Sequence, residues 1–214
     1  MLSAHELRQL AGQYDGRRYP ESIYTHCLGV LAGASRADAD IDRVERAIWV
    51  LFHWKLGKVH THKTPGGDPF SLQGIATPLY LTRCQPNSEQ PIAAALNLVD
   101  EGLLFRDGAL PHDEFKVQAG TITERRASIV LPAFLMHIWR PHDYPILDRY
   151  VFQAMLALLK EQVRRNTQPR SWAHYEEYTR FFDCLVSETG LSRRVVDKGL
   201  WVYGHTLRTC REND

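Results

Sequence analysis

Apolar residues recur at helical spacing along most of the chain. In residues 40–57, "DIDRVERAIWVLFHWKLG", the side chains of Val44, Ile48, Leu51 and Phe52 fall on one side of a 3.6-residue helix. Such spacing is typical of a helix that buries one face. The same reasoning predicts further helices over 3–14, 89–105, 125–139, 145–159, 171–190 and 192–210.

Several helix ends carry the residues that helix ends prefer. Thr121 followed by Glu124 has the pattern of a capping box, in which two side chains bond the free N–H groups of a first turn. Ser171 and Gly190 predict the two ends of one helix. Pro132 predicts a kink or a break in the helix that follows Glu124, because proline cannot donate a backbone hydrogen bond.

Two segments lack helical spacing. Residues 59–78 are rich in glycine and proline and predict the longest loop, which is also the weakest point of the chain. Residues 110–124 are interpreted as connecting structure, and alternation typical of a strand occurs only in 74–83, where Pro78 weakens it. The predicted class is all-α, as one domain over 1–214 with two helical lobes and a central cleft between them.

Composition adds little to the prediction of an all-α domain. The 214 residues are 44% hydrophobic and carry a formal net charge of +1, which argues against a strongly basic nucleic-acid-binding arm. Of the 26 basic residues, 20 are arginine. Arginine suits bidentate contact with phosphate, although GC-rich coding would produce the same excess. No apolar run is long enough for a membrane span and the first residues do not resemble a signal peptide, so we expect no membrane partner and a cytoplasmic location.

The residues that most often build reactive or metal centres form no strong pattern. The four cysteines, Cys27, Cys84, Cys184 and Cys210, are far apart and form no CxxC pair. His53, His60 and His62 suggest a metal-dependent hydrolase, but no acidic residue stands at helical spacing from them. We therefore expect neither a metal nor a cofactor.

One aspartate stands out in "IWRPHDYPILDRYVFQAMLALL", residues 138–159. Pro141 and Pro145 bracket a sharp turn, and a new helix is expected to begin near Pro145 or Ile146. Asp148 lies on the stripe of its buried face, so its carboxylate should point to the interior or into a cleft. The alternative is that Asp148 only caps the helix or pairs with an arginine.

The segment "YPILDRYVFQAM" resembles the segment that follows the helix-hairpin-helix in a superfamily of DNA glycosylases, which includes endonuclease III and the 8-oxoguanine glycosylases. Its pattern of proline, aliphatic residue, aspartate and valine is matched by Pro145, Ile146, Asp148 and Val151. The ending "GLSRRVVDKGLWVYG" is similar to that of small bacterial proteins with an 8-oxoguanine-glycosylase-like fold. The matching residues there are Asp197, Leu200, Trp201 and Gly204. The resemblance covers residues 121–205 and leaves 1–78 less certain.

The resemblance implies that Asp148 is the catalytic carboxylate of a DNA N-glycosylase and that the partner is damaged or modified DNA. The Asp148 carboxylate would stabilise positive charge on the deoxyribose and orient the attacking water. Aromatic and basic residues would hold the flipped base and the backbone phosphates. The candidates for the base site are Trp139, Tyr144, Trp54, Lys55 and Trp201, and those for the phosphates are Arg125, Arg126, Arg140 and Arg149.

The sequence departs from this family in two places. The glycine-rich hairpin that grips a phosphate is absent, and Gly120 is the single glycine there. Arg125 and Arg126 stand where bifunctional members carry a lysine nucleophile, and arginine cannot form a Schiff base. We therefore expect a monofunctional enzyme, unless Lys55 supplies the amine. The alternative is a DNA-binding module without chemistry, and the base recognised and the role in repair or in defence against foreign DNA stay open.

Overall fold

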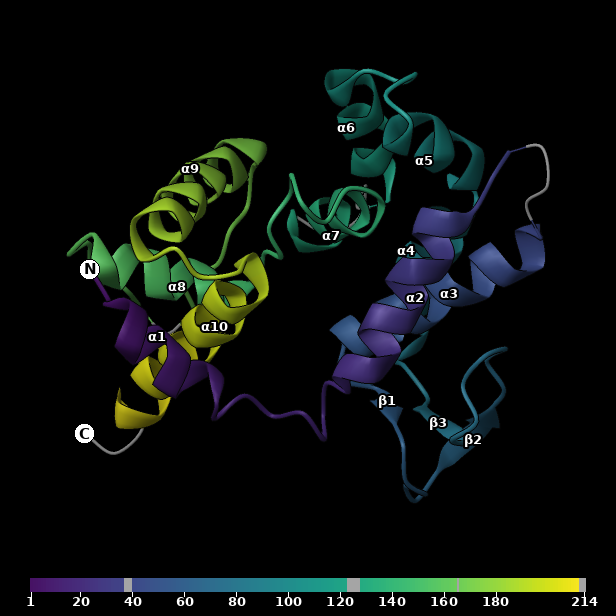
Figure 1. Ribbon diagram of the computed structural model, residues 1–214, viewed down its shortest axis with the longest axis horizontal. Helices are drawn as coiled ribbons and strands as arrows, with labels where there is room; N and C mark the ends of the chain where they lie inside the picture. The colour runs from purple at the N-terminus through teal and green to yellow at the C-terminus, as the bar shows by residue number, and fades with distance from the viewer. Residues whose placement is uncertain (37–39, 123–127, 165, 212–214) are drawn as a thin grey trace. The chain divides into compact units, whose positions relative to one another are not determined.

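The structure is a computed structural model that describes residues 1–36, 40–122, 128–164 and 166–211, with the backbone alone for 208–211. Within these residues the chain is mostly helical, with ten helices and one small three-stranded sheet. The helical character predicted from apolar spacing is therefore confirmed (Figure 1). No helix in the described part of the chain combines the length and the apolar character needed to cross a membrane.

The chain divides into two compact units. Unit 1 comprises residues 1–14, 125–137 and 141–214, and unit 2 comprises 15–124 and 138–140. No boundary falls in the predicted weak point at 59–78. The helices of unit 1 are α1 (Ala4–Ala11), most of α7 (Val130–Trp139), α8 (Arg149–Leu158), α9 (Trp172–Thr189) and α10 (Arg193–Arg211), and those of unit 2 are α2 (Glu21–Gly33), α3 (Ile41–Lys55), α4 (Pro86–Leu96), α5 (Val99–Arg106) and α6 (His112–Thr121).

Helix α3 forms the centre of unit 2. It packs against α2, α4 and α5, and residues on every side of it are buried, including Ala47, Ile48, Val50 and Leu51. The start of α3 follows a local rule, because the Asp40 side chain accepts a hydrogen bond from the N–H of the residue three positions later. The helix predicted over 40–57 is confirmed in position.

A small antiparallel sheet also belongs to unit 2, in the order β1-β3-β2. Its strands are β1 (Val59–His60), β2 (Gly67–Phe70) and β3 (Leu79–Thr82). The central strand β3 buries Leu79 and Leu81 and pairs both neighbours, with Leu81 opposite Val59 and Asp68. The prediction of a continuous loop over 59–78 was wrong, because polar edge strands gain their stability from the central strand and show no apolar alternation of their own.

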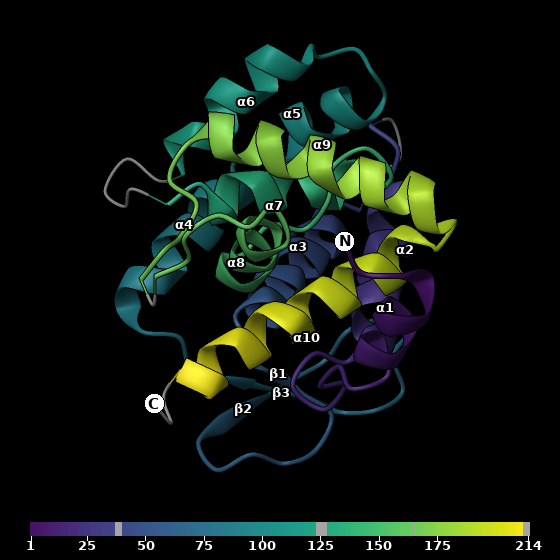
Figure 2. The same ribbon diagram turned by 90° about the vertical axis from the view of Figure 1, so that its left-hand side faces the viewer.

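Helix α8 lies between α9 and α10 in unit 1, and α1 runs alongside α10 (Figures 1 and 2). The core between these helices contains Val151, Met155, Tyr178, Phe182 and Leu200, each essentially inaccessible to water. Burial of such side chains is the main favourable contribution to folding. The predicted apolar stripe of the helix after Pro145 therefore faces this core.

Several predicted boundaries need correction. Helix α2 was not predicted, α6 was taken as connecting structure, and the helix predicted over 89–105 is two helices, α4 and α5. Thr121 is not an N-cap, since it ends α6 and its hydroxyl donates to the carbonyl of Gln118. Helix α7 begins at Val130, so Pro132 lies in its first turn, where proline costs no hydrogen bond and requires no break.

Candidate functional site

The turn that leads to Asp148 is anchored at two points within unit 1. His137, on α7, contacts the carbonyl of Tyr144 through Nδ1 at 2.6 Å, so this nitrogen carries the proton and donates. The hydroxyl of Tyr175, on α9, donates to the carbonyl of Pro145 at 2.9 Å in a buried position, where burial raises the pKa of Tyr175 well above its usual value. The backbone before Asp148 is therefore held by two helices.

Asp148 is the N-cap of α8. Its Oδ1 accepts hydrogen bonds from the N–H groups of Tyr150 at 2.7 Å and of Val151 at 3.0 Å. The helix thus begins at Arg149 and not near Pro145 or Ile146, because Asp148 adopts an extended conformation with φ −151° and supplies the cap. Asp148 therefore does cap the helix, and capping fixes the orientation of its half-buried carboxylate, while the catalytic role stays a prediction.

An aromatic cluster lies beside the first turn of α8. The Trp201 ring on α10 makes edge contacts with Tyr14 at 5.3 Å and with Tyr150 at 5.5 Å between centroids, and it stacks on His205 at 5.2 Å. We call these four residues the aromatic cluster. They come from three places in the sequence, and all belong to unit 1. Because the Tyr150 N–H also bonds Asp148, the cluster and the carboxylate share one residue.

Three cations lie over rings of the aromatic cluster. The guanidinium groups of Arg149 and Arg194 lie 4.9 Å from the Tyr150 ring and 5.2 Å from the Tyr14 ring, and the ammonium of Lys198 lies 5.6 Å from Tyr14. Arg149 also donates to the Tyr150 hydroxyl at 3.1 Å. Cations at these distances are attracted by the ring electrons. This end of unit 1 therefore combines half-buried aromatic rings with positive charge, although the charge of Arg194 is offset by an ion pair with Asp197.

A buried tyrosine, Tyr178, interacts electrostatically with Asp148. The Tyr178 side chain has an accessible fraction of 0%, and its hydroxyl has no hydrogen-bond partner among the described residues. Burial, and then the charges of Asp197 and Asp148, raise the pKa of Tyr178 well above its usual value. The hydroxyl therefore stays protonated as a donor. Asp197 is itself buried and forms an ion pair with Arg194.

Two glycines let α10 approach its neighbours closely. A Cβ atom at Gly204 would overlap the carbonyl oxygen of Tyr150, and one at Gly199 would lie 2.9 Å from the carbonyl oxygen of Leu7 on α1. Only glycine permits this approach of the backbone. Gly204 therefore brings α10, with Trp201 and His205, against the first turn of α8.

Four predicted site residues belong to unit 2. Trp54 is buried, donates its indole N–H to the carbonyl of Pro20 at 3.1 Å and stacks on Tyr24 at 4.7 Å. Lys55 ends α3 in a half-buried position. Trp139 is buried and packs against Gly102, where a Cβ atom would overlap its ring. Arg140 lies over the Phe105 ring at 5.2 Å. Packing within unit 2 thus accounts for Trp54 and Trp139.

The remaining predicted residues are distributed as follows. Trp201 belongs to the aromatic cluster, and Arg149 is one of the cations over its rings. Tyr144 is half-buried and packs against the core of unit 1. Arg125 and Arg126 lie outside the described residues. A footprint of four arginines therefore stays a prediction, with only Arg149 placed beside Asp148.

The cysteines and histidines show no reactive centre in the described chain. Burial raises the pKa of Cys27 to about 12, and the hydrogen bond from Cys184 to Glu188 raises the pKa of that exposed thiol. The rings of His60 and His62 contact each other at 5.7 Å. Among the residues whose positions are described, no group of three or more His, Cys, Asp or Glu side chains could hold a metal ion.

Comparisons with protein-family models, with curated proteins and with solved structures found no match.

Sequence reasoning identified Asp148, Arg149 and Trp201 but missed Tyr14, Tyr150 and Tyr178. The spacing of Asp148 and Tyr150 could have indicated a shared turn, whereas Tyr14 and Tyr178 join only through tertiary packing. The arrangement places one fixed carboxylate beside aromatic rings and cations, which suits a cationic transition state next to a planar, anionic ligand.

Proposed function

We propose that the protein hydrolyses the N-glycosidic bond of a damaged or modified base in DNA. The bond between C1′ and the base nitrogen breaks, and the base leaves with the electron pair and takes up a proton from solvent. Positive charge develops on the deoxyribose, and the Asp148 carboxylate stabilises it. Water then adds to C1′ and gives its proton to this carboxylate, so that no covalent intermediate with the protein is needed.

The observation that carries this proposal is the fixed orientation of Asp148. Two backbone N–H groups hold one of its carboxylate oxygens, and His137 and Tyr175 hold the turn before it. A carboxylate positioned in this way need not reorganise as the sugar becomes positive, and such preorganised charge lowers a barrier by several kcal/mol. A flexible surface aspartate would lose most of that advantage to solvent.

The neighbouring residues support a nucleic acid as the partner. The half-buried Trp201 and Tyr150 rings are the candidates on which a base would stack, and Arg149 and Lys198 supply positive charge for phosphates. Two compact units are compatible with the two lobes that the glycosylase resemblance implies. We propose a cytoplasmic location for this activity. Arg125 and Arg126, where a lysine nucleophile would stand, favour attack by water.

The test uses the full-length protein with duplexes and single strands that carry a panel of damaged and modified bases, followed by alkali to cleave abasic sites. The decisive variant is Asp148→Asn. Asparagine caps a helix as well as aspartate does, so this variant should fold normally while it loses the negative charge. We expect base release to fall about 100-fold or more, as for removal of a preorganised electrostatic contact, with DNA binding retained.

Asp143→Asn is the matched control, because it removes one negative charge from the exposed part of the same turn. Base release should match that of the unchanged protein. If Asp148→Asn released the base as fast as Asp143→Asn, the catalytic role of Asp148 would be refuted. DNA binding without release over the whole panel would instead favour a binding module that recognises modified or damaged DNA.

A further inference from the structure

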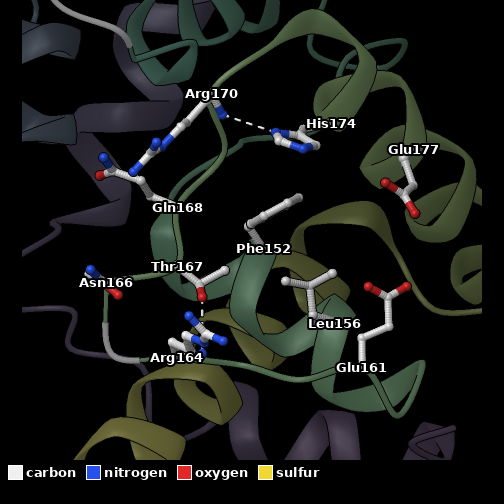
Figure 3. Close-up of a pocket in the computed structure, with 10 residues that line it drawn as sticks. All are labelled: Phe152, Leu156, Glu161, Arg164, Asn166, Thr167, Gln168, Arg170, His174 and Glu177. Carbon is white, nitrogen blue, oxygen red and sulfur yellow. Dashed lines mark hydrogen bonds between the residues drawn. The ribbon is translucent and has the colours of Figure 1, made fainter.

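Unit 1 contains a second candidate site, a pocket of about 460 Å³. Its floor is formed by Phe152 and Leu156 of α8, and its walls come from α9 and from the segment that joins α8 to α9 (Figure 3). This volume falls in the range of small-molecule sites. The wall residues are Glu161, Arg164, Asn166, Thr167, Gln168, Arg170, His174 and Glu177.

A side chain of α8 anchors the joining segment at Thr167. Gln153, an amide that is 3% exposed, donates through Nε2 to the carbonyl of Thr167 at 2.8 Å. The Thr167 hydroxyl accepts a hydrogen bond from the Arg164 N–H at 3.0 Å. The Thr167 N–H donates to the Arg164 carbonyl, also at 3.0 Å. A buried polar side chain thus holds the backbone at Thr167, between the exposed residues Asn166 and Gln168.

His174, on α9, contacts both the joining segment and the floor of the pocket. Its Nδ1 accepts a hydrogen bond from the Arg170 N–H at 3.1 Å, so the proton of the neutral ring is on Nε2 (Figure 3). The ring also lies 5.2 Å from the Phe152 ring. His174 therefore links the backbone of Arg170 to the floor of the pocket.

Charge is distributed unevenly around the pocket. Figure 3 shows Arg164 and Arg170, with the amides of Asn166 and Gln168, on one side of the floor, and Glu161 and Glu177 on the other. Arginine forks match the geometry of phosphate, whereas glutamate accepts hydrogen bonds from amino groups. The apolar floor between them suits a flat ring. An amino acid is a poor fit, because its ammonium and carboxylate share one carbon and cannot reach both sides.

We propose that this pocket binds a nucleotide whose base carries an exocyclic amino group. The phosphate contacts Arg164 and Arg170, the base lies against Phe152 and Leu156, and the amino group donates to Glu177 or Glu161. This chemistry is shared by free nucleoside monophosphates and by a nucleotide unit of a single strand. The site does not involve Asp148 and does not depend on the glycosylase proposal.

The test is calorimetric titration of the full-length protein with AMP, CMP, GMP, UMP and inorganic phosphate, and with single-stranded oligo-dA. We expect at least one amino-bearing nucleotide to bind about tenfold or more tightly than UMP, and Arg170→Ala to weaken it by at least that factor. The oligonucleotide titration shows which source is preferred. Arg180→Ala, at an exposed position farther along α9, is the matched loss of charge and should leave affinity unchanged.

Two further variants separate the ends of the ligand. Glu177→Gln combined with Glu161→Gln should abolish the preference over UMP but retain phosphate-dependent binding, while Asp148→Asn should change nothing. Binding of no nucleotide, equal binding of UMP, inorganic phosphate binding as tightly as the nucleotides, or equal losses in Arg170→Ala and Arg180→Ala would each overturn the proposal.

Discussion

Helices α8 and α9 of unit 1 begin with the same local geometry but in different surroundings. Asp148 and Ser171 both cap from an extended backbone, with φ −151° and −143°. Asp148 accepts two backbone hydrogen bonds, of 2.7 and 3.0 Å, whereas Ser171 accepts one of 3.4 Å. The longer helix, α9, thus begins with the weaker cap. A serine suffices to start an 18-residue helix, so helix initiation does not by itself require a carboxylate at position 148.

The difference lies in what surrounds each cap. Ser171 is exposed, and the residue before it, Arg170, belongs to the wall of a polar pocket. Asp148 is half-buried, and the residue that it bonds, Tyr150, is covered by rings from α10. Local sequence therefore fixes the geometry of a cap, while tertiary packing decides whether the capping group has a further use.

The largest expected effect comes from the glycine that brings α10 against α8. In Gly204→Ala the new Cβ would overlap the backbone carbonyl of Tyr150, which cannot rotate away as a side chain does. We expect a loss of about 3 kcal/mol in the free energy of unfolding, because one of the helices must shift. Urea unfolding followed by circular dichroism measures this change.

Gly29→Ala is the control for that variant. Gly29 lies within α2, and no atom stands within 4 Å of a Cβ added there. Alanine is the better helix former, so this variant should gain about 0.5–1 kcal/mol. A Gly204→Ala protein as stable as Gly29→Ala would contradict the close approach of α10 to the start of α8.

A smaller difference should separate the two caps. Asp148→Ala removes two hydrogen bonds and a charge that the helix dipole favours, and should cost about 2 kcal/mol. Ser171→Ala removes one long bond at an exposed position and should cost about 0.5–1 kcal/mol. The measurement is again urea unfolding, at neutral pH. Equal losses would mean that the surroundings of Asp148 add nothing to capping.

Much of the helical framework could be predicted because its determinants are local. Ser171 and Gly190 mark helix ends at the predicted places, and Gly190 adopts the left-handed conformation, φ 62°, that glycine favours. Helix α2 could have been predicted as well, since its buried residues Ile23, Cys27, Val30 and Leu31 recur at intervals of three and four. Helix α6 shows only two buried residues, and its pattern was too weak to distinguish it from a loop.

The candidate site was less predictable, for a physical reason. The position of Asp148 after a proline turn could be read from the sequence, but its environment depends on Trp201, more than fifty positions away, and on Tyr14 near the start of the chain. No local rule relates such residues. Trp54 and Trp139 illustrate the same difficulty, because an isolated tryptophan reveals neither a core nor a binding surface, and both pack within unit 2.

The smallest effect on stability concerns two buried tyrosines of α9, Tyr175 and Tyr178. Tyr178→Phe removes a hydroxyl that has no hydrogen-bond partner in the described chain, so its free energy of unfolding at pH 8 should lie within about 1 kcal/mol of the unchanged protein. Tyr175→Phe is the control, because it also loses the bond to the Pro145 carbonyl and should be the less stable variant by about 1 kcal/mol.

The alkaline pH dependence sharpens this comparison. Burial raises the pKa of Tyr178 in the folded state, so the stability linked to its neutral form is complete below the unfolded value near pH 10 and is lost as the pH rises above it. Phenylalanine has no proton to lose. Between pH 8 and 11, measured by urea unfolding, the unchanged protein should therefore lose stability relative to Tyr178→Phe, by up to about 1.4 kcal/mol per pH unit above 10. Parallel curves would show that the Tyr178 hydroxyl reaches solvent and ionises freely in the folded protein.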